Sequence, residues 1–502
     1  MNKYDVIIIG SGLGSLVCAN ILSREGFHVC VLEKHAQAGG CLQNFSRHNH
    51  SFDTGVHYLG GMLPGQPLYN YWNYLGILPG IKLHRLDADG FDIIAFDKGE
   101  FPLAQGFEHF SEQLLPYFPK GKDALTNYIQ HLLAISTAFP LYNLEIPETY
   151  SREDLFRSRS ACQFLTNLTT GIRNPESGIQ LSSVLAGNNF LYAGDRDSTP
   201  LHHLALTNHV FISSAWQLAG GSNQLTLALG KNIEKNGGSL LLRNEVSSIH
   251  HANDRFTIRT KAGEVFFSSI VISGIHPANT YRMMDTSLVR PMTRNRIFAL
   301  PNTGAAFSLF LCLKKDAIPY QNYNYHFFKN FNVWSTSSSG AEWPLRYMLY
   351  TPFPPNGGIF AETMIVMTYL DFSMFKRWEN TTVGRRGQEY LETKHLLENK
   401  LLDVVEQKYP CLRQNITYME SATPLTWRDY TGTPEGSMYG IRKDFSDSVR
   451  TTILPRTKIP NFYFTGQNIN LHGLLGVTIG AVTTCGEILG LENLLNKIRN
   501  AR

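Results

Sequence analysis

Cysteine is scarce in this sequence, and the few cysteines form no motif. Seven are scattered over 502 residues, with no CxxC pair and no cluster at metal-ligand spacing. An odd, scattered set argues against a disulfide framework and against a structural zinc site. We therefore expect no bound metal, reduced thiols, and a reducing compartment such as the cytoplasm.

Long runs of one charge and long, purely apolar runs are absent as well. The 45 basic and 41 acidic residues leave a net charge of +4 and form no basic tract, so nucleic acid is not an expected partner. Residues 459–486 carry no formal charge but include Pro460, Gln467 and Asn468, which makes a poor membrane span. A strand-like run begins at Tyr4, so we expect no cleaved secretory signal.

Apolar material for a large interior is plentiful. Hydrophobic residues make up 43% of the chain and charged residues 17%, which is a globular composition. A chain of 502 residues exceeds what one core usually supports, so two or three structural units are expected. The 30 phenylalanines and 23 tyrosines suit a large core and a large apolar pocket equally well.

The first 33 residues have the pattern of a strand–helix–strand unit. Residues 4–9 (YDVIII) and 27–33 (FHVCVLE) have buried-strand patterns, and apolar residues at helical spacing lie between them. Such a unit makes its two strands parallel. Further strand patterns at 239–272 and at NFYFTG, before a glycine-spaced helix from about 473, indicate a discontinuous α/β domain.

The turn after the first strand reads GSGLGS and predicts a dinucleotide-binding loop. Gly10 permits the tight turn, and Gly12 lets a pyrophosphate approach the backbone at the start of the helix. Gly14 and Ser15 stand where the pattern usually has its third glycine. Ser15 is small enough for close packing of the helix on the strand.

Residues further along favour FAD over NAD. Glu33 ends the second strand, where a carboxylate accepts hydrogen bonds from the adenosine ribose, and we place Lys34 in the same site. Gly39 and Gly40 form a second glycine turn, which is typical of FAD-binding members of this fold. The sequence has no second strand–GxGxxG–helix unit that would hold NAD(P) in a domain of its own.

A third glycine-rich element, FTGQNINLHGLLGVTIG, occupies residues 464–480. Gly466 and Gln467 form the turn after a strand, and Gly473 and Gly476 suit a helix that approaches the flavin ring closely. The N–H groups at the start of that helix would stabilise negative charge on a reduced flavin.

These motifs resemble those of the phytoene desaturase-like FAD oxidoreductases, and within them the branch of retinol saturases (all-trans-retinol 13,14-reductases) and carotenoid isomerases. The resemblance covers most of the chain, in AGGCLQNF (38–45), FDTGVHYLGG (52–61), AGGSNQLTLAL (219–229), VISGIHP (271–277) and PLTWRDYTGTPEGSMYG (424–440). It implies that the Val246 backbone contacts adenine and that Gly274 lies in the returning FAD segment. Cys41 replaces the arginine of many desaturases and amine oxidases, and we place it at the flavin without a covalent link.

The implied fold class is α/β, with a Rossmann-type FAD-binding domain of the glutathione-reductase-like kind and an inserted α+β substrate domain. The FAD-binding domain would comprise three segments, 1–70, 215–285 and 455–502. The substrate domain would comprise the two intervening segments, 71–214 and 286–454.

The resemblance implies an FAD-dependent oxidoreductase acting on carbon–carbon double bonds of an apolar polyene, such as a retinoid, a carotenoid or a polyene lipid. We expect it to saturate one such bond. Close relatives in the family desaturate or isomerise polyenes, so a desaturase and a redox-neutral cis–trans isomerase stay open. An amine-oxidase-like enzyme and a flavin-binding scaffold are further alternatives. The electron donor is also open, with transient NAD(P)H as one candidate.

Saturation needs a hydride at one carbon and a proton at the other, and three residues are candidates for supplying the proton. His57 and Tyr58 follow Gly55 in the saturase-like motif, and His472 precedes the flavin-facing helix. Each of them would equally fit a purely structural role, His57 by anchoring its turn to backbone carbonyls. Asp53 is expected to brace the same turn.

The aromatic stretch PLYNYWNYLGIL (67–78) allows two interpretations. Its aromatic residues suit a membrane-docking surface through which a lipid-like substrate arrives. They also suit an ordinary amphipathic core helix, which we favour. Peripheral contact with a membrane stays open.

Overall fold

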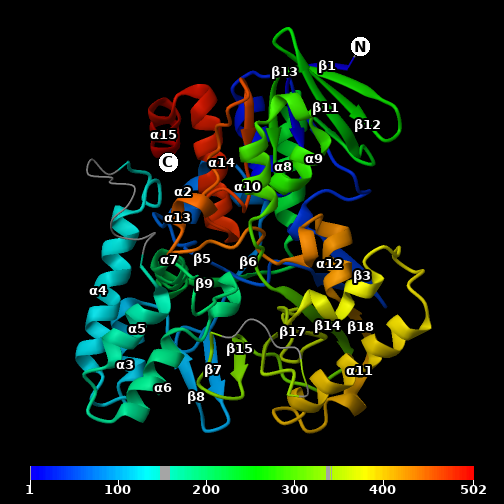
Figure 1. Cartoon of the computed structure of the whole chain (residues 1–502). Coiled ribbons are helices and arrows are strands. Elements are labelled where there is room, and N and C mark those ends of the chain that lie inside the picture. Colours follow the sequence, from blue (N-terminus) through cyan, green and yellow to red (C-terminus); the bar gives the residue numbers. More distant parts are fainter. Residues whose placement is uncertain (1, 147–158, 335–339, 341, 502) are drawn as a thin grey trace.

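Two seven-stranded sheets dominate the computed structural model, which describes residues 2–146, 159–334, 340 and 342–501. Figure 1 shows the sheet that contains β1 and β13 at the top of the molecule and the sheet that contains β7, β14 and β18 at the bottom. Helices surround both sheets. The arrangement confirms the α/β class expected from the sequence.

The upper sheet has the order β10–β2–β1–β13–β12–β11, and β19 pairs with β13. Its central strands pair in parallel, whereas β11, β12 and β13 pair antiparallel. The strands are β1 (Asn2–Ile9), β2 (Val29–Leu32), β10 (Ser239–Leu241), β11 (Val246–Ala252), β12 (Arg255–Thr260), β13 (Val265–Ser273) and β19 (Phe462–Phe464). Burial of the parallel strands explains the continuous apolar run at the start of the chain.

Helix α1 (Leu13–Arg24) follows β1 and packs between two other helices. These are α8 (Asn223–Lys235) and α14 (Gly473–Leu489), which come from the middle and the end of the chain. Nearly every residue of α1 is buried, because the sheet and both helices cover it. The C-terminal helix α15 (Leu491–Asn500) lies beside α14 at the top of the molecule (Figure 1).

The lower sheet has the order β18–β14–β17–β16–β15–β7–β8. The strands are β7 (Asp92–Phe96), β8 (Gly99–Leu103), β14 (Ala305–Leu313), β15 (Asn324–Phe328), β16 (Arg346–Tyr350), β17 (Thr363–Leu370) and β18 (Ile416–Ala422). The four strands from β14 to β17 are buried along their whole length. Their side chains therefore form core on both faces of the sheet.

Most of the remaining helices lie around the lower sheet and between the sheets, whereas α9 packs against β11 of the upper sheet (Figure 1). They are α2 (Pro67–Tyr74), α3 (Phe107–Leu114), α4 (Lys122–Ala138), α5 (Ala161–Thr169), α6 (Pro175–Leu185), α7 (Leu201–Ser213), α9 (Pro277–Met283), α10 (Pro291–Phe298), α11 (Gln388–Val405), α12 (Pro424–Thr431) and α13 (Ser448–Thr451). Tyr71, Trp72 and Tyr74 of α2 are buried, which confirms that this aromatic stretch belongs to the core.

Two small sheets accompany the two large ones. The hairpin of β3 (Asn44–Arg47) and β4 (His50–Asp53) is one, and the other joins β5 (Leu59–Gly60), β9 (Ala215–Leu218) and β6 (Leu83–Arg85). The upper sheet takes its strands from 1–70, 215–285 and 455–502, and the lower sheet takes its strands from the other two segments. We keep the five-segment division as a proposal that this sorting supports.

Within the described part of the chain, no helix combines the length and the apolar character that crossing a bilayer requires.

Candidate active site

A cavity of about 450 Å³ lies at the carboxyl ends of the upper sheet's parallel strands. This is the edge at which open α/β sheets bind nucleotides. Of the fifteen residues expected at the cofactor, thirteen line it: Gly10, Gly12, Gly14, Glu33, Lys34, Gly39, Gly40, Cys41, Val246, Gly274, Gly466, Gln467 and Gly473. The two N-terminal glycine turns and the C-terminal glycine-rich element, which lies more than 400 residues further along the chain, therefore meet in one site.

The glycines of the first turn have different structural roles. Gly10 has a φ of +84°, which side-chain-bearing residues rarely adopt. A Cβ on Gly12 would meet nothing within 4 Å, so a side chain there would enter the cavity. A Cβ on Gly14 would lie 2.7 Å from the backbone nitrogen of Gly466. Gly14 therefore lets α1 approach the turn at Gly466 closely.

Ser15 does not line the cavity. A Cβ on Gly274 would collide with the Ser15 hydroxyl, so these two residues form the close contact between α1 and the turn after β13. The small side chain at position 15 has the packing role expected from the sequence.

Glu33 is buried, and both of its carboxylate oxygens accept hydrogen bonds. Ser11 donates to Oε2 from its backbone nitrogen at 3.0 Å and from its hydroxyl at 2.5 Å, and the His35 nitrogen donates to Oε1 at 2.8 Å. The Ser11 hydroxyl in turn accepts from the Gly39 nitrogen at 3.0 Å. Ser11 thus links the two glycine turns, a role that we did not expect from the sequence although it stands between Gly10 and Gly12.

The lining of this cavity fits FAD. The N-cap of helix α1 is Gly12, which provides no side-chain cap, so the first N–H groups of the helix and its positive dipole end are available to a pyrophosphate. Among the described residues, the buried oxygens Asn244 Oδ1 and Ser437 Oγ have no hydrogen-bond partner, and both residues line the cavity. Lys34 Nζ has a protein partner, since it donates to the Asp429 carbonyl of α12 at 3.0 Å. Burial lowers the pKa of Lys34.

A second cavity, of about 140 Å³, adjoins the first. The residues that line both cavities are Gly55, Val56, Met438, Tyr439, Gly473 and Leu474. All three proton-donor candidates, His57, Tyr58 and His472, line this second cavity, and so does Gly476, which we had expected at the cofactor. No Asp, Glu, Lys or Arg occurs among the described residues of its lining. We call it the apolar cavity.

His57 is held at both ring nitrogens. Its Nδ1 lies 2.5 Å from the Tyr350 hydroxyl of β16, and its Nε2 lies 2.8 Å from the Met367 sulfur of β17. Burial lowers the pKa of His57 to about 3, so the ring is neutral at physiological pH. No backbone carbonyl is among these partners, which differs from the anchoring expected for a structural histidine here.

Tyr58 points its hydroxyl toward the lower sheet. The hydroxyl donates to Asp92 Oδ2 of β7 at 3.0 Å, and Asn324 Nδ2 of β15 donates to Asp92 Oδ1 at 3.0 Å. Burial beside Asp92 raises the pKa of Tyr58 well above its usual range. Tyr58 therefore lines the apolar cavity, and its hydroxyl proton is engaged by Asp92.

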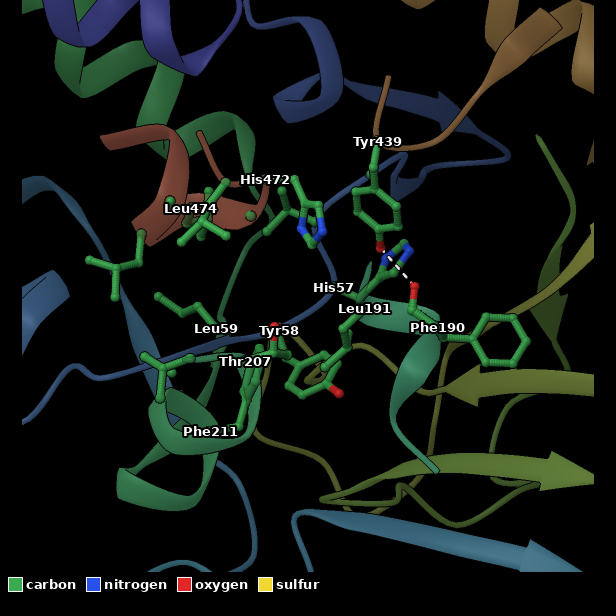
Figure 2. A pocket seen from close by; sticks show the side chains of 18 of the residues that line it. His57, Tyr58, Leu59, Phe190, Leu191, Thr207, Phe211, Tyr439, His472 and Leu474 are labelled. Carbon is green, nitrogen blue, oxygen red and sulfur yellow. Dashed lines mark hydrogen bonds between the residues drawn. The ribbon is translucent and has the colours of Figure 1, made fainter. Parts of the chain in front are cut away.

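His472 and Tyr439 lie side by side where the two cavities meet (Figure 2). Their ring centroids are 4.5 Å apart, and the Tyr439 hydroxyl donates to the Phe190 carbonyl at 2.9 Å. Among the described residues, His472 Nε2 has no hydrogen-bond partner. Burial lowers the pKa of His472 to about 3, and its ring is therefore neutral. Tyr439 lay within a quoted motif, but its role was not recognised from the sequence.

Two neighbours of the site have structural contacts. Asp53 accepts hydrogen bonds from the nitrogen and the hydroxyl of Ser222 at 2.6 and 2.7 Å, which matches a bracing role. Burial raises the pKa of Asp53 to about 6. Cys41 packs against Gly55, and burial raises the pKa of its thiol to about 11, so it is not a thiolate at neutral pH.

Comparisons with known proteins agree with this geometry. Residues 16–487 match the family described as flavin containing amine oxidoreductase. The all-trans-retinol 13,14-reductase of Rattus norvegicus is 27% identical to this chain, over 99% of the chain and 88% of its own length. The chloroplastic prolycopene isomerase 1 of an Oncidium hybrid cultivar is 24% identical, over 98% of this chain and 85% of its own length.

A solved oxidoreductase from Methanosarcina mazei has the same fold, with a TM-score of 0.65 at 17% identity, covering 96% of this chain and 99% of its own. The family is flavin-containing, which implies FAD. The resemblance found in the motifs is confirmed over the full length of the chain. The chain belongs to the flavin containing amine oxidoreductase family, in the branch of FAD oxidoreductases that includes all-trans-retinol 13,14-reductases and prolycopene isomerases.

Proposed function

We propose that this chain uses FAD to saturate a carbon–carbon double bond of an apolar polyene, such as a retinoid, a carotenoid or a polyene lipid. The observation that carries the proposal is the junction of the two cavities. An uncharged, largely apolar space opens onto the site that fits the cofactor, with six lining residues in common. A polyene in the apolar cavity would therefore meet the cofactor without passing through water.

The lining argues against an amine substrate. An amine is a cation at neutral pH, and burying it requires a paired charge or several good acceptors. Among the described residues, the lining of the apolar cavity offers no carboxylate. A hydrocarbon chain has no such requirement, and its transfer into the cavity is favoured by about 25 cal/mol for each Å² of apolar surface removed from water.

Bound FAD supplies hydride transfer, and the chain's own residues must hold the alkene, exclude water and supply the proton. Leu191, Phe211 and Leu474 line the cavity and exclude water from it (Figure 2). We assign the proton to Nε2 of His57. With the Tyr350 hydroxyl donating to Nδ1, the ring proton lies on Nε2, where the Met367 sulfur is a weak acceptor and competes little with the substrate for it.

In this assignment the other candidates have positioning roles. Asp92 holds the Tyr58 hydroxyl away from the substrate, and Tyr58 keeps its aromatic face against it. His472 lies at the mouth between the cavities with Nε2 unengaged among the described residues. It therefore offers a hydrogen-bonding group to a substrate or cofactor atom that lies where the two cavities meet.

Product mass after anaerobic turnover of pre-reduced holoenzyme with a panel of polyenes tests the proposal. A gain of two hydrogens supports saturation, and an unchanged mass with altered geometry would instead indicate an isomerase. Loss of two hydrogens with oxidised enzyme would indicate a desaturase. A flavin that no donor and acceptor pair reduces and reoxidises would indicate a scaffold. The bound cofactor itself is checked by denaturation, which should release FAD and neither FMN nor NAD(P).

We also propose that the protein works in a reducing compartment such as the cytoplasm, which fits its seven free cysteines, and that it contacts membranes peripherally. The contact surface would be formed by α10 and α13. Met292 on α10 and Val449 on α13 are 86% and 77% exposed, and Arg296 Nη1 joins the two helices by donating to the Arg450 carbonyl at 2.7 Å. Exposed apolar side chains between arginines suit an anionic lipid surface.

Vesicle co-sedimentation tests this contact. Wild-type protein should pellet with vesicles containing phosphatidylserine more than with phosphatidylcholine alone, and added salt should weaken the difference. Val449→Asp should lower the bound fraction. Ile359→Asp is the matched control, because Ile359 is also 77% exposed and lies elsewhere, near the lower sheet. Equal binding of both variants would contradict the assignment of this surface.

A further inference from the structure

A third cavity, of about 900 Å³, lies on the side of the cofactor cavity formed by α12 and the β3–β4 hairpin. The segment 383–391 at the start of α11 and the edge of β18 complete its lining. Gly40, Trp427, Tyr430 and Thr431 line this cavity and the cofactor cavity alike. Its size is within the range of small-molecule sites. The proposed reaction assigns it no ligand.

The charge of the third cavity favours an anion. Arg386 pairs with Asp429 at 2.5 Å, and Arg428 shares this carboxylate at 2.8 Å. Glu420 alone faces both Lys394, at 3.1 Å, and Arg47, at 3.6 Å. Arg385 adds a further cation, and no ion pair of it occurs among the described residues. Three cations and one carboxylate thus line the cavity besides the Arg386–Asp429 pair, and this imbalance would be relieved by a ligand with two or more negative charges.

The backbone beside Arg385 suits phosphate groups in particular. The N-cap of helix α11 is Gly387, which provides no side-chain cap, and the helix runs for 18 residues from Gln388. Its N–H groups and dipole therefore favour an anion at this end. Gly384 and Gly387 have φ values of +78° and +86°, and a Cβ on either would meet nothing within 4 Å. The Gly-Arg-Arg-Gly loop thus leaves its backbone open to a ligand.

The rest of the lining suits flat or apolar rings. Tyr430 is 49% exposed and Val383 is 52% exposed at the rim. Trp427 lies deeper, at the boundary with the cofactor cavity. Aromatic side chains beside cations bind ligands that carry both phosphates and heterocycles. The lining residues therefore provide for both parts of a dinucleotide.

We propose that the third cavity binds a reduced nicotinamide dinucleotide, with its phosphates at Arg385 and the start of α11 and its nicotinamide toward Trp427 and Gly40. This inference rests on the proposed function, which requires two electrons for each double bond. The dihydronicotinamide would give a hydride with its electron pair to oxidised FAD and leave as the oxidised dinucleotide. The reduced flavin would then carry that hydride to the polyene, and the protein would supply the proton.

Binding to the holoenzyme tests the site independently of turnover. Calorimetry with NADP⁺ and with NAD⁺, neither of which can reduce the flavin, should detect binding of at least one. Arg385→Ala should weaken that binding tenfold or more at unchanged flavin content. Arg259→Ala, an exposed arginine on β12 away from the cavity, should leave it unchanged. Absence of binding by both dinucleotides, or equal binding by the two variants, would overturn the proposal.

Anaerobic flavin bleaching separates this proposal from the proposed function. NADPH or NADH should bleach wild-type flavin, and Arg385→Ala should slow the bleaching at least tenfold while dithionite bleaches both alike. Saturation by dithionite-reduced enzyme without dinucleotide binding would refute the donor site and leave the reductase intact. Bleaching by the dinucleotide without change in any polyene would support the donor site and refute the proposed reductase activity. Displacement of a bound dinucleotide by polyenes or by oleate would assign the cavity to lipid and overturn the proposal.

Discussion

Replacing Glu33 separates the role of this residue in the fold from its expected role toward FAD. In the structure its carboxylate accepts from the buried Ser11 nitrogen and hydroxyl and from the His35 nitrogen. Glu33→Ala leaves the Ser11 N–H without an acceptor, which should lower the free energy of unfolding by about 1–3 kcal/mol. Glu33→Gln retains one carbonyl oxygen, so its loss should be smaller.

The effect on FAD binding adds to this loss. A carboxylate that accepts from the ribose hydroxyls contributes about 1.5–3 kcal/mol through charge-assisted bonds, which corresponds to a rise in Kd of about 10- to 150-fold when it is removed. Thermal unfolding of the apoprotein measures the structural share. Titration of FAD into the apoprotein, followed by flavin fluorescence, measures the cofactor share.

Glu33→Gln is the decisive variant, because it keeps the shape and removes the charge. We expect it to unfold close to wild type and to bind FAD at least tenfold more weakly. A Kd equal to that of wild type would show that the ribose is recognised elsewhere. The carboxylate would then serve only to hold Ser11 and the turn after β1.

Three further predictions follow from the same site. Gly12→Val should purify with little flavin, because its side chain would enter the cofactor cavity; a full complement of FAD would show that the pyrophosphate lies elsewhere. His57→Ala combined with Tyr58→Phe should lower the rate of saturation by about 10²-fold or more at normal flavin content. Tyr58→Phe alone should have a small effect, because the Tyr58 proton is engaged by Asp92. A large effect of this single variant would assign the proton donor to Tyr58. The apoprotein should lose stability as pH falls below about 6.5, because burial holds the pKa of His57 and of His472 at about 3 in the folded state. Each histidine should account for about 2 kcal/mol of lost stability by pH 5. His472→Asn should reduce this loss in a pH series of melting temperatures, and an undiminished loss would contradict the assignment.

The cofactor site could be predicted from the sequence to a large extent, because its elements are local. A glycine turn needs only the few residues that bend it, and an apolar run before it and a helical pattern after it specify a strand and a helix. The turn at Gly10, the carboxylate at Glu33 and the pair at Gly39 and Gly40 were therefore recognisable one by one. Because the strands before them are parallel, their turns had to meet at one edge of the sheet.

The partners of the candidate catalytic residues were decided only by the tertiary structure. His57 meets Tyr350 and Met367, which lie 293 and 310 residues further along the chain, and Tyr58 meets Asp92 on a strand of the other sheet. Such contacts depend on how the two sheets pack, and neither periodicity nor spacing carries that information. The same holds for the third cavity, whose walls come from a hairpin, a loop, two helices and the edge of β18. The sequence by itself determined which glycine turns line the expected cofactor cavity, and the packing of distant elements decided which side chains line the apolar cavity.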